Sequence, residues 1–181
     1  MVTATISITE ADLFHTLGNF LTYVLPSGTP VVKAQTNRVA EPANTNFVTM
    51  TPSLRQRLGF NWTEFSDGYP STASVQTDNA PTDVSVQLDI HGPLAADNLQ
   101  ILTTLFWSGW GCDQFATSGF DITPLWCSTP VQAPFLNAEQ QIETRWTVDF
   151  HMQVNAVVTI TQQFAAALDV ELVSVEAVYH P

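Results

Sequence analysis

Basic residues are scarce in this chain. Its 181 residues include 17 acids but only five Lys and Arg, which gives a formal net charge of -12. Proteins that hold DNA or RNA tightly cluster Lys and Arg against the phosphates, and here only Arg55 and Arg57 lie close together in the sequence. The composition therefore argues against tight nucleic-acid binding.

Cysteines and long apolar runs are also lacking. Cys112 and Cys127 allow at most one disulfide, and we expect two reduced thiols rather than a bridge. No apolar run approaches the roughly 20 residues that cross a bilayer, and residues 1–8 lack the basic and apolar regions of a signal peptide. We therefore expect a soluble chain, made in the cytoplasm, with no membrane partner.

Charged residues of either sign make up only 12% of the chain, while 45% of the residues are apolar. The apolar fraction is sufficient for a core, and the length fits one domain over residues 1–181. Charge is depleted at the centres of protein interfaces, so we expect part of the surface to be covered by other proteins.

Hydrophobic periodicity predicts two principal helices. The first covers residues 9–25, where Thr9 and Asp12 have the spacing of a capping box. The second covers residues 93–107, where Pro93 suits the first helical turn. A short apolar helix is also predicted over residues 161–168.

Several strands are predicted, and strict alternation makes two of them clear, over residues 83–91 and 145–155. The segments 31–39 and 47–50 are expected to form a hairpin, and a last strand covers 170–179. No regular βαβ alternation appears. We therefore predict an α+β fold, in which a mainly antiparallel or mixed sheet carries two principal helices on one face.

Two segments, about 59–82 and about 109–137, lose periodicity and are expected to be irregular. Trp62 and Phe65 lie in the first segment, where they either cap the core or anchor a neighbouring subunit. Trp107, Trp110 and Trp126 are further candidate anchors, although single tryptophans more often belong to a core.

Motifs of catalysis are missing, because the sequence holds no Gly-rich phosphate loop, nucleophile elbow or zinc-protease helix. Two Asp-x-His pairs are weak metal-site candidates, and they are Asp89 with His91 and Asp149 with His151. The favoured interpretation is that they are polar residues on open strand faces. We therefore expect no catalytic residues, no cofactor and no enzyme.

Three segments, taken in order, resemble the phage neck terminator family, the tail terminators of contractile-tailed phages. They are Gln35–Pro42, Phe47–Pro52 and Asn137–Trp146. Residues 84–106 and 162–176 are also similar, so the resemblance spans nearly the whole chain with a tail-terminator-like fold.

The resemblance implies a structural virion protein of the tail neck that assembles in the host cytoplasm. Such proteins form a ring, commonly a homohexamer, that caps the head-proximal end of the tail tube. The implied partners are the tube protein and a head completion or connector protein, with the sheath as a further candidate. DNA passes through the central channel without specific binding.

The matched segments contain candidate interface residues. They are Arg38, Glu41, Glu139, Gln140 and Arg145. With so few bases in the chain, the two arginines are expected to pair with acids, either across a subunit boundary or within their own hairpin and strand end.

Two other functions remain open at this point. One is another neck component, such as a head completion or tube-like protein. The second is a small metal-dependent enzyme or ligand-binding domain that uses the Asp-x-His pairs.

Overall fold

The computed structural model describes residues 4–34, 42, 46–68, 74–136 and 142–162. Its centre is an antiparallel pair of long strands, β5 (Val75–His91) and β10 (Arg145–Thr161), which pair along their whole lengths. At about 3.4 Å per residue, 17 residues extend about 58 Å. Both predicted central strands are confirmed, although each is longer than its region of alternation.

Shorter strands flank this pair on both sides. In the main sheet, β5 also pairs with β3 and β4, β10 pairs with β1, β6 and β7, and β2 lies beyond β3. The short strands of this sheet are β1 (Ala4–Ile6), β2 (Val31–Lys33), β3 (Phe47–Arg57), β4 (Trp62–Ser66), β6 (Ile122–Cys127) and β7 (Val131–Gln132). A separate two-stranded sheet consists of β8 (Phe135–Leu136) and β9 (Ile142–Glu143). The mixed sheet with helices confirms the α+β class.

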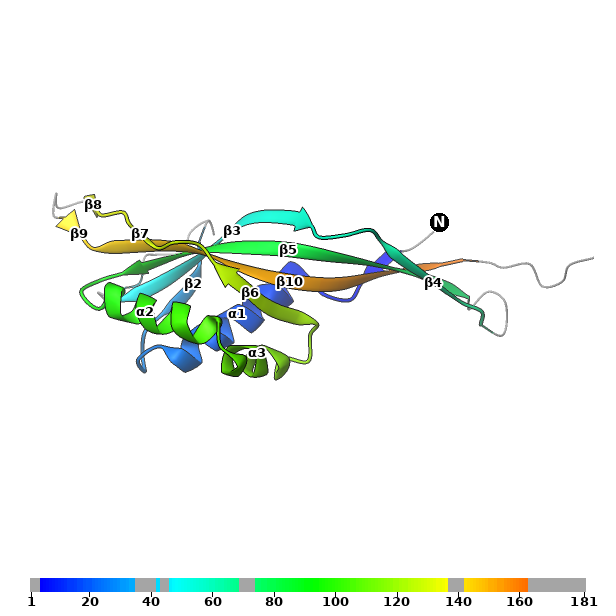
Figure 1. The fold of residues 1–181 in the computed structure, drawn as a ribbon, viewed down its shortest axis with the longest axis horizontal. Helices are drawn as coiled ribbons and strands as arrows, with labels where there is room; N and C mark the ends of the chain where they lie inside the picture. The colour runs from blue at the N-terminus through cyan, green and yellow to red at the C-terminus, as the bar shows by residue number, and fades with distance from the viewer. Residues whose placement is uncertain (1–3, 35–41, 43–45, 69–73, 137–141, 163–181) are drawn as a thin grey trace, which may run out of the picture.

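Three helices occur in the described residues, and Figure 1 draws them on the same side of the sheet. They are α1 (Glu10–Val24), α2 (Ala95–Phe106) and α3 (Gly109–Ala116). None of the described helices combines the length and the apolar character needed to span a membrane.

The predicted capping box of α1 is confirmed. The Thr9 hydroxyl accepts a hydrogen bond from the Asp12 amide, and the Asp12 carboxylate accepts one from the Thr9 amide at 2.8 Å. The Thr9 hydroxyl also donates to the Asp12 carboxylate at 2.6 Å, and this bond, followed by the one from the Thr9 amide, lowers the pKa of Asp12. The box satisfies amide groups that would otherwise lack partners at the start of the helix.

The hydrophobic core lies between the helices and one face of the sheet. On β5 this face carries the even-numbered residues from Val84 to Ile90, and on β10 it carries those from Val148 to Val154; all are buried. Leu17 and Leu102 are fully buried among the helical residues of the same core. The alternation read from the sequence therefore identifies the face that packs against the helices.

The predicted hairpin over residues 31–50 is wrong. β2 and β3 are adjacent but parallel, with Val31 opposite Val48, whereas a hairpin requires antiparallel strands. β3 takes its antiparallel partner from β5, with Val48 opposite Ile90. Local turn residues did not reveal the strand direction, because it depends on pairing with a distant strand.

The two segments expected to be irregular are largely ordered. The segment 59–82 contains β4 and the first part of β5, where polar residues and Pro81 hide the alternation. The segment 109–137 contains α3, β6 and β7. α3 starts at the Ser108 cap, and Gly111 permits close approach to the end of α2, because a Cβ there would lie 2.4 Å from the carbonyl oxygen of Leu105.

Two other predicted elements, the helix over 161–168 and the strand over 170–179, cannot be compared in full. Thr161 is the last residue of β10, and residues from 163 onward lie outside the described part.

Candidate functional site

Polar side chains are buried on the sheet face opposite the helices. Five of them have less than a tenth of their surface exposed, and they are Asp83, Ser85, Asp89, His91 and His151. Buried polar groups destabilise a fold unless they find hydrogen-bond partners. The hydrogen-bond partners of these five side chains therefore decide whether this face is a stable polar network or a reactive site.

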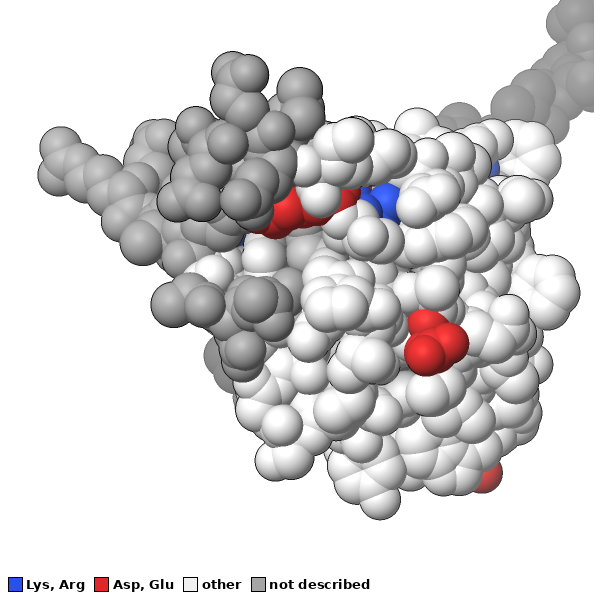
Figure 2. Space-filling view, turned by 90° about the vertical axis from the view of Figure 1, so that its left-hand side faces the viewer, with Lys and Arg blue, Asp and Glu red and all other residues white. Residues whose placement is uncertain are grey.

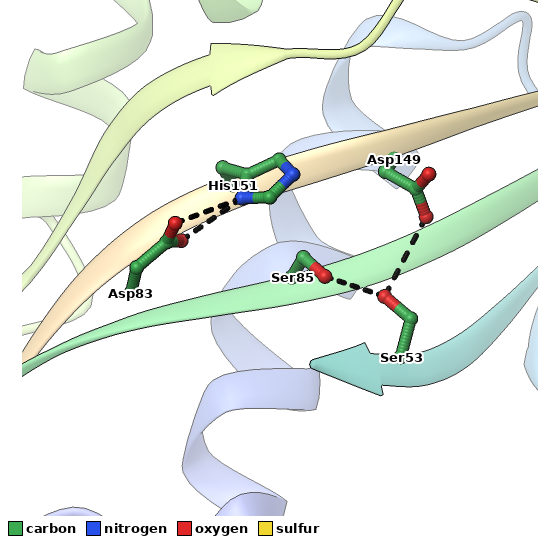
Figure 3. A network of polar contacts seen from close by, with 5 residues as sticks. All are labelled: Ser53, Asp83, Ser85, Asp149 and His151. Atoms are coloured by element: carbon green, nitrogen blue, oxygen red, sulfur yellow. Dashed lines mark hydrogen bonds and ion pairs between the residues drawn. The ribbon is translucent and has the colours of Figure 1, made fainter. Parts of the chain in front are cut away.

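His151 is held from two sides. Its Nδ1 atom lies 3.0 Å from both carboxylate oxygens of Asp83, as Figure 3 shows. The Trp126 ring is stacked on the imidazole, with centroids 3.7 Å apart and planes 11° apart. Because a carboxylate only accepts hydrogen bonds, Nδ1 must carry a proton. Strands β5, β6 and β10 each contribute one residue to this cluster.

A chain of hydroxyl groups lies beside this cluster (Figure 3). The Ser53 and Ser85 hydroxyl oxygens are 2.5 Å apart, and the Ser53 hydroxyl donates to Asp149 at 3.5 Å. Ser53 lies at an irregularity in the pairing of β3 with β5, between Pro52 and Leu54. Such irregularities redirect individual side chains.

Arg145 lies near an acid of its own chain. Its Nε is 3.5 Å from the carboxylate of Asp89, and the two side chains are 33% and 13% exposed. The neighbouring His91 stacks on Phe47 with ring centroids 4.2 Å apart. The contact is the intrachain pairing that the sequence left open, and a contact of Arg145 with another subunit stays a prediction.

The structure does not bring the two Asp-x-His pairs together as a metal site. His151 faces Ser85 in the β-ladder, six positions from His91 on β5, which corresponds to about 20 Å along the strand. Among the residues described, no group of three or more His, Cys, Asp or Glu has the arrangement of a metal site. The hypothesis requires the two strands to pair, which they do, but their register separates His91 from His151.

Asp83, Ser53 and Trp126 were not predicted as partners of the Asp-x-His residues. Asp83 shares the polar face of its strand with Asp89, which is the one sequence signal available. Its pairing with His151 becomes visible only when the register of β5 and β10 is known, because the two residues are separated by 68 positions.

The far end of the sheet forms a projecting arm. We use this name for β1, β4, residues 75–81 of β5 and residues 156–161 of β10. Figure 1 shows β4 and these strand ends extending beyond the helices. Their side chains are exposed or half-buried.

Trp62 and Phe65 lie on β4 of the arm, and they are 64% and 61% exposed. Neither caps the core as one interpretation expected. Trp62 pairs with Asn79 and Phe65 with Gln76, and residues an odd number of positions apart on a strand face opposite sides. The two aromatic residues therefore belong to different faces of the arm.

Four of the candidate interface residues, Arg38, Glu41, Glu139 and Gln140, lie outside the described residues. Cys112 and Cys127 are both free thiols, as expected. Burial raises the pKa of Cys127, because desolvation disfavours the thiolate.

Charges are unevenly distributed over the described surface. The three helices contain the acids Glu10, Asp12, Asp97 and Asp113 and no Lys or Arg. Figure 2 shows one end of the molecule, where few charged side chains appear among the described residues. Arg55 and Arg57 are exposed on β3, and neither forms an ion pair among the described residues. The pKa of Glu10 on α1 is lowered mainly by its hydrogen bond to Lys33, and the charge of Arg55 adds to this effect.

Two hollows of the described surface hold few ionisable groups. A groove of about 350 Å³ between α2 and the sheet edge is lined by Leu99, Gln100, Pro130 and Trp146 among other residues, none of them ionisable. A second hollow, of about 180 Å³, contains Arg55 as its one ionisable lining residue. Neither hollow contains an acid and base pair for proton transfer.

Comparison with known proteins identifies a family. No curated protein sequence matches the chain. The profile of the family described as phage neck terminator protein matches residues 11–178, which is nearly the whole chain and includes the central strands β5 and β10. This chain therefore belongs to the phage neck terminator protein family, a family of structural proteins of the virion tail.

Proposed function

We propose that this protein forms a ring, with a homohexamer as the expected form, at the head-proximal end of the tail tube of a contractile-tailed phage. The ring closes the tube after its length is set and joins it to a head completion or connector protein. The match of the family profile over residues 11–178 carries this proposal. The sheath is a further candidate neighbour.

The charge of the chain supports a role as a conduit for DNA. Each Lys or Arg that contacts a phosphate strengthens the binding of the duplex, and that contact must break when the duplex moves. A chain with five Lys and Arg residues and a net charge of -12 is expected to bind the DNA phosphates weakly. The genome then passes through the ring without specific binding.

The polar sheet face supports a structural rather than a catalytic role. His151 is bonded to Asp83 and covered by Trp126, so the imidazole is fixed by its neighbours. The two hollows described above lack an acid and base pair. We infer that the polar network fixes the register of the central strands, in a chain that acts as one domain.

The test is the mass and shape of the purified protein, with and without tube protein. Light scattering is expected to give a multiple of 19.9 kDa, and negative-stain images are expected to show a central hole. A duplex-binding assay at physiological salt is expected to show no tight complex. A particle that stays monomeric in both conditions, or that binds duplex tightly, contradicts the proposal.

The position in the virion distinguishes this function from that of a different neck component. Density for the chain between the last tube ring and the connector is expected. Density within the connector or along the tube would assign it to head completion or to the tube instead.

A further inference from the structure

We propose that the apolar face of the projecting arm packs on the helices of a second copy of this chain. The arm is then the contact between neighbouring subunits, an inference that rests on the ring proposed above. The argument uses the register of the strands, the area of the arm and the distribution of charge.

The core-facing side of the sheet continues onto the arm. β5 and β10 pair without a shift in register from Arg145 opposite His91 to Thr161 opposite Val75. Val158 and Ile160 therefore face the same side as the buried Met152 and Val154. On β1, Ile6 pairs with Val158, which places its 52% exposed side chain on this face.

The opposite face of the arm is more polar. By the same register it carries Thr77 and Asn79 from β5, Val157 and Thr159 from β10, and Trp62 and Glu64 from β4, whereas Gln76 and Asp78 are the β5 residues on the apolar face. An exposed sheet normally directs polar side chains to water and apolar ones to a partner layer. Among the described elements, no helix lies over the apolar side at this end (Figure 1).

The area of the arm sets the strength of the contact. Four strands at about 4.8 Å spacing and seven residues at about 3.4 Å give a face of at most about 450 Å². Two partners then bury at most about 900 Å², which is close to the lower limit of roughly 1,000 Å² for a specific interface. A single contact is therefore weak, whereas a closed ring gives each subunit two contacts.

The charges select the helices as the acceptor. Arg55 pairs with Val84 and Arg57 with Thr82, so both arginines lie at the base of the arm on its apolar side. The helices carry no Lys or Arg, and because Glu10 pairs with Lys33 and Asp12 bonds to Thr9, Asp97 and Asp113 are their acids without an ion pair among the described residues. Asp113 is exposed on α3, three residues after Trp110. The ring centroids of Trp110 and Tyr23 lie 5.8 Å apart, and the Tyr23 side chain is 71% exposed.

The geometry favours a repeating contact between copies. The apolar face of the arm and the helices lie on the same side of the sheet. A displacement along the sheet alone leaves both surfaces facing the same way, so the second copy must also be rotated relative to the first to bring its helices against the arm. Such head-to-tail contacts join two different surfaces, and they close into a ring when the rotation between copies permits.

The experiment compares two adjacent valines of β10 that face opposite sides, in the full chain with tube protein present. Val158→Asp introduces a charge on the apolar face, and Val157→Asp introduces the same charge on the polar face. We expect Val158→Asp to raise the concentration needed for ring assembly by at least about tenfold. Val157→Asp is expected to leave it within a few-fold of the wild type.

A charge exchange tests the acceptor surface. Arg57→Asp and Asp113→Arg are each expected to weaken assembly several-fold, and the double variant is expected to recover most of the loss. Loss in both single variants without recovery in the double variant overturns the pairing with the helices.

Other outcomes separate the two proposals. Rings that form equally well from the wild type and Val158→Asp overturn the arm contact and leave the ring itself standing. A lower melting temperature of Val158→Asp with unchanged assembly shows that the chain's own residues cover the face. A wild type that never assembles, even with tube protein, overturns the ring and the arm contact together.

Discussion

Removing the Asp83 carboxylate is expected to destabilise the protein, because His151 depends on it. Asp83→Ala leaves the protonated Nδ1 of His151, which lies 3.0 Å from both carboxylate oxygens, without this acceptor. Both residues are less than a tenth exposed, so water does not readily replace the carboxylate. An unsatisfied buried donor costs about 1–3 kcal/mol.

The expected loss is measurable by thermal and denaturant unfolding. For a chain of this length, 1 kcal/mol corresponds to about 2–4 °C in melting temperature. We therefore expect the melting temperature of Asp83→Ala to fall by about 2–12 °C. Glu64→Ala, which removes an exposed carboxylate on β4, is the matched control and is expected to change the free energy of unfolding by less than about 0.5 kcal/mol.

A double-mutant cycle isolates the contact between the two side chains. His151→Ala removes the stacking on Trp126, worth about 0.5–1.5 kcal/mol, and leaves Asp83 without this donor. The double variant is expected to be more stable than the sum of the single effects predicts. Additive effects, or an Asp83→Ala variant as stable as Glu64→Ala, would refute the structural role of the pair.

Three further predictions concern the helices. Thr9→Ala removes the cap of α1 and is expected to cost about 1 kcal/mol in chemical denaturation. The pKa of Asp12 is lowered in the folded state, so its contribution to stability is present above its unfolded pKa of about 3.9 and is lost as the pH falls through the folded value. Asp12→Asn is expected to remove this part of the pH dependence. An unchanged dependence of the free energy of unfolding on pH in the acid range would contradict this role of Asp12. Gly111→Ala places a Cβ 2.4 Å from the Leu105 carbonyl oxygen and is expected to lower the free energy of unfolding by about 1–3 kcal/mol or more. Gly109→Ala is the control, because nothing lies within 4 Å of a Cβ at that position. Equal stabilities of the two variants would refute the close approach.

Local signals in the sequence predicted α1, α2 and the core-facing residues of the central strands. The capping box at Thr9 acts over three residues, and alternation over residues 83–91 acts within one strand. Both patterns come from contacts that each segment makes with a core on one side, so they are visible without the rest of the fold. The scarcity of bases likewise restricted the possible partners, because net charge follows from composition alone.

Long-range pairing was decided only by the tertiary structure. The same alternation does not show that Asp83 meets His151, that β2 runs parallel to β3, or that Trp62 and Phe65 face opposite sides of an arm. The arm itself was hidden, because residues 75–82 of β5 are mostly polar and include Pro81, so they show no clear alternation. Register joins residues that are far apart in the chain, and no local pattern encodes the partner. The sequence alone therefore determined α1, α2, the core-facing residues of the central strands and the charge, whereas the packing of distant strands determined which side chains form the polar network and which lie exposed on the arm.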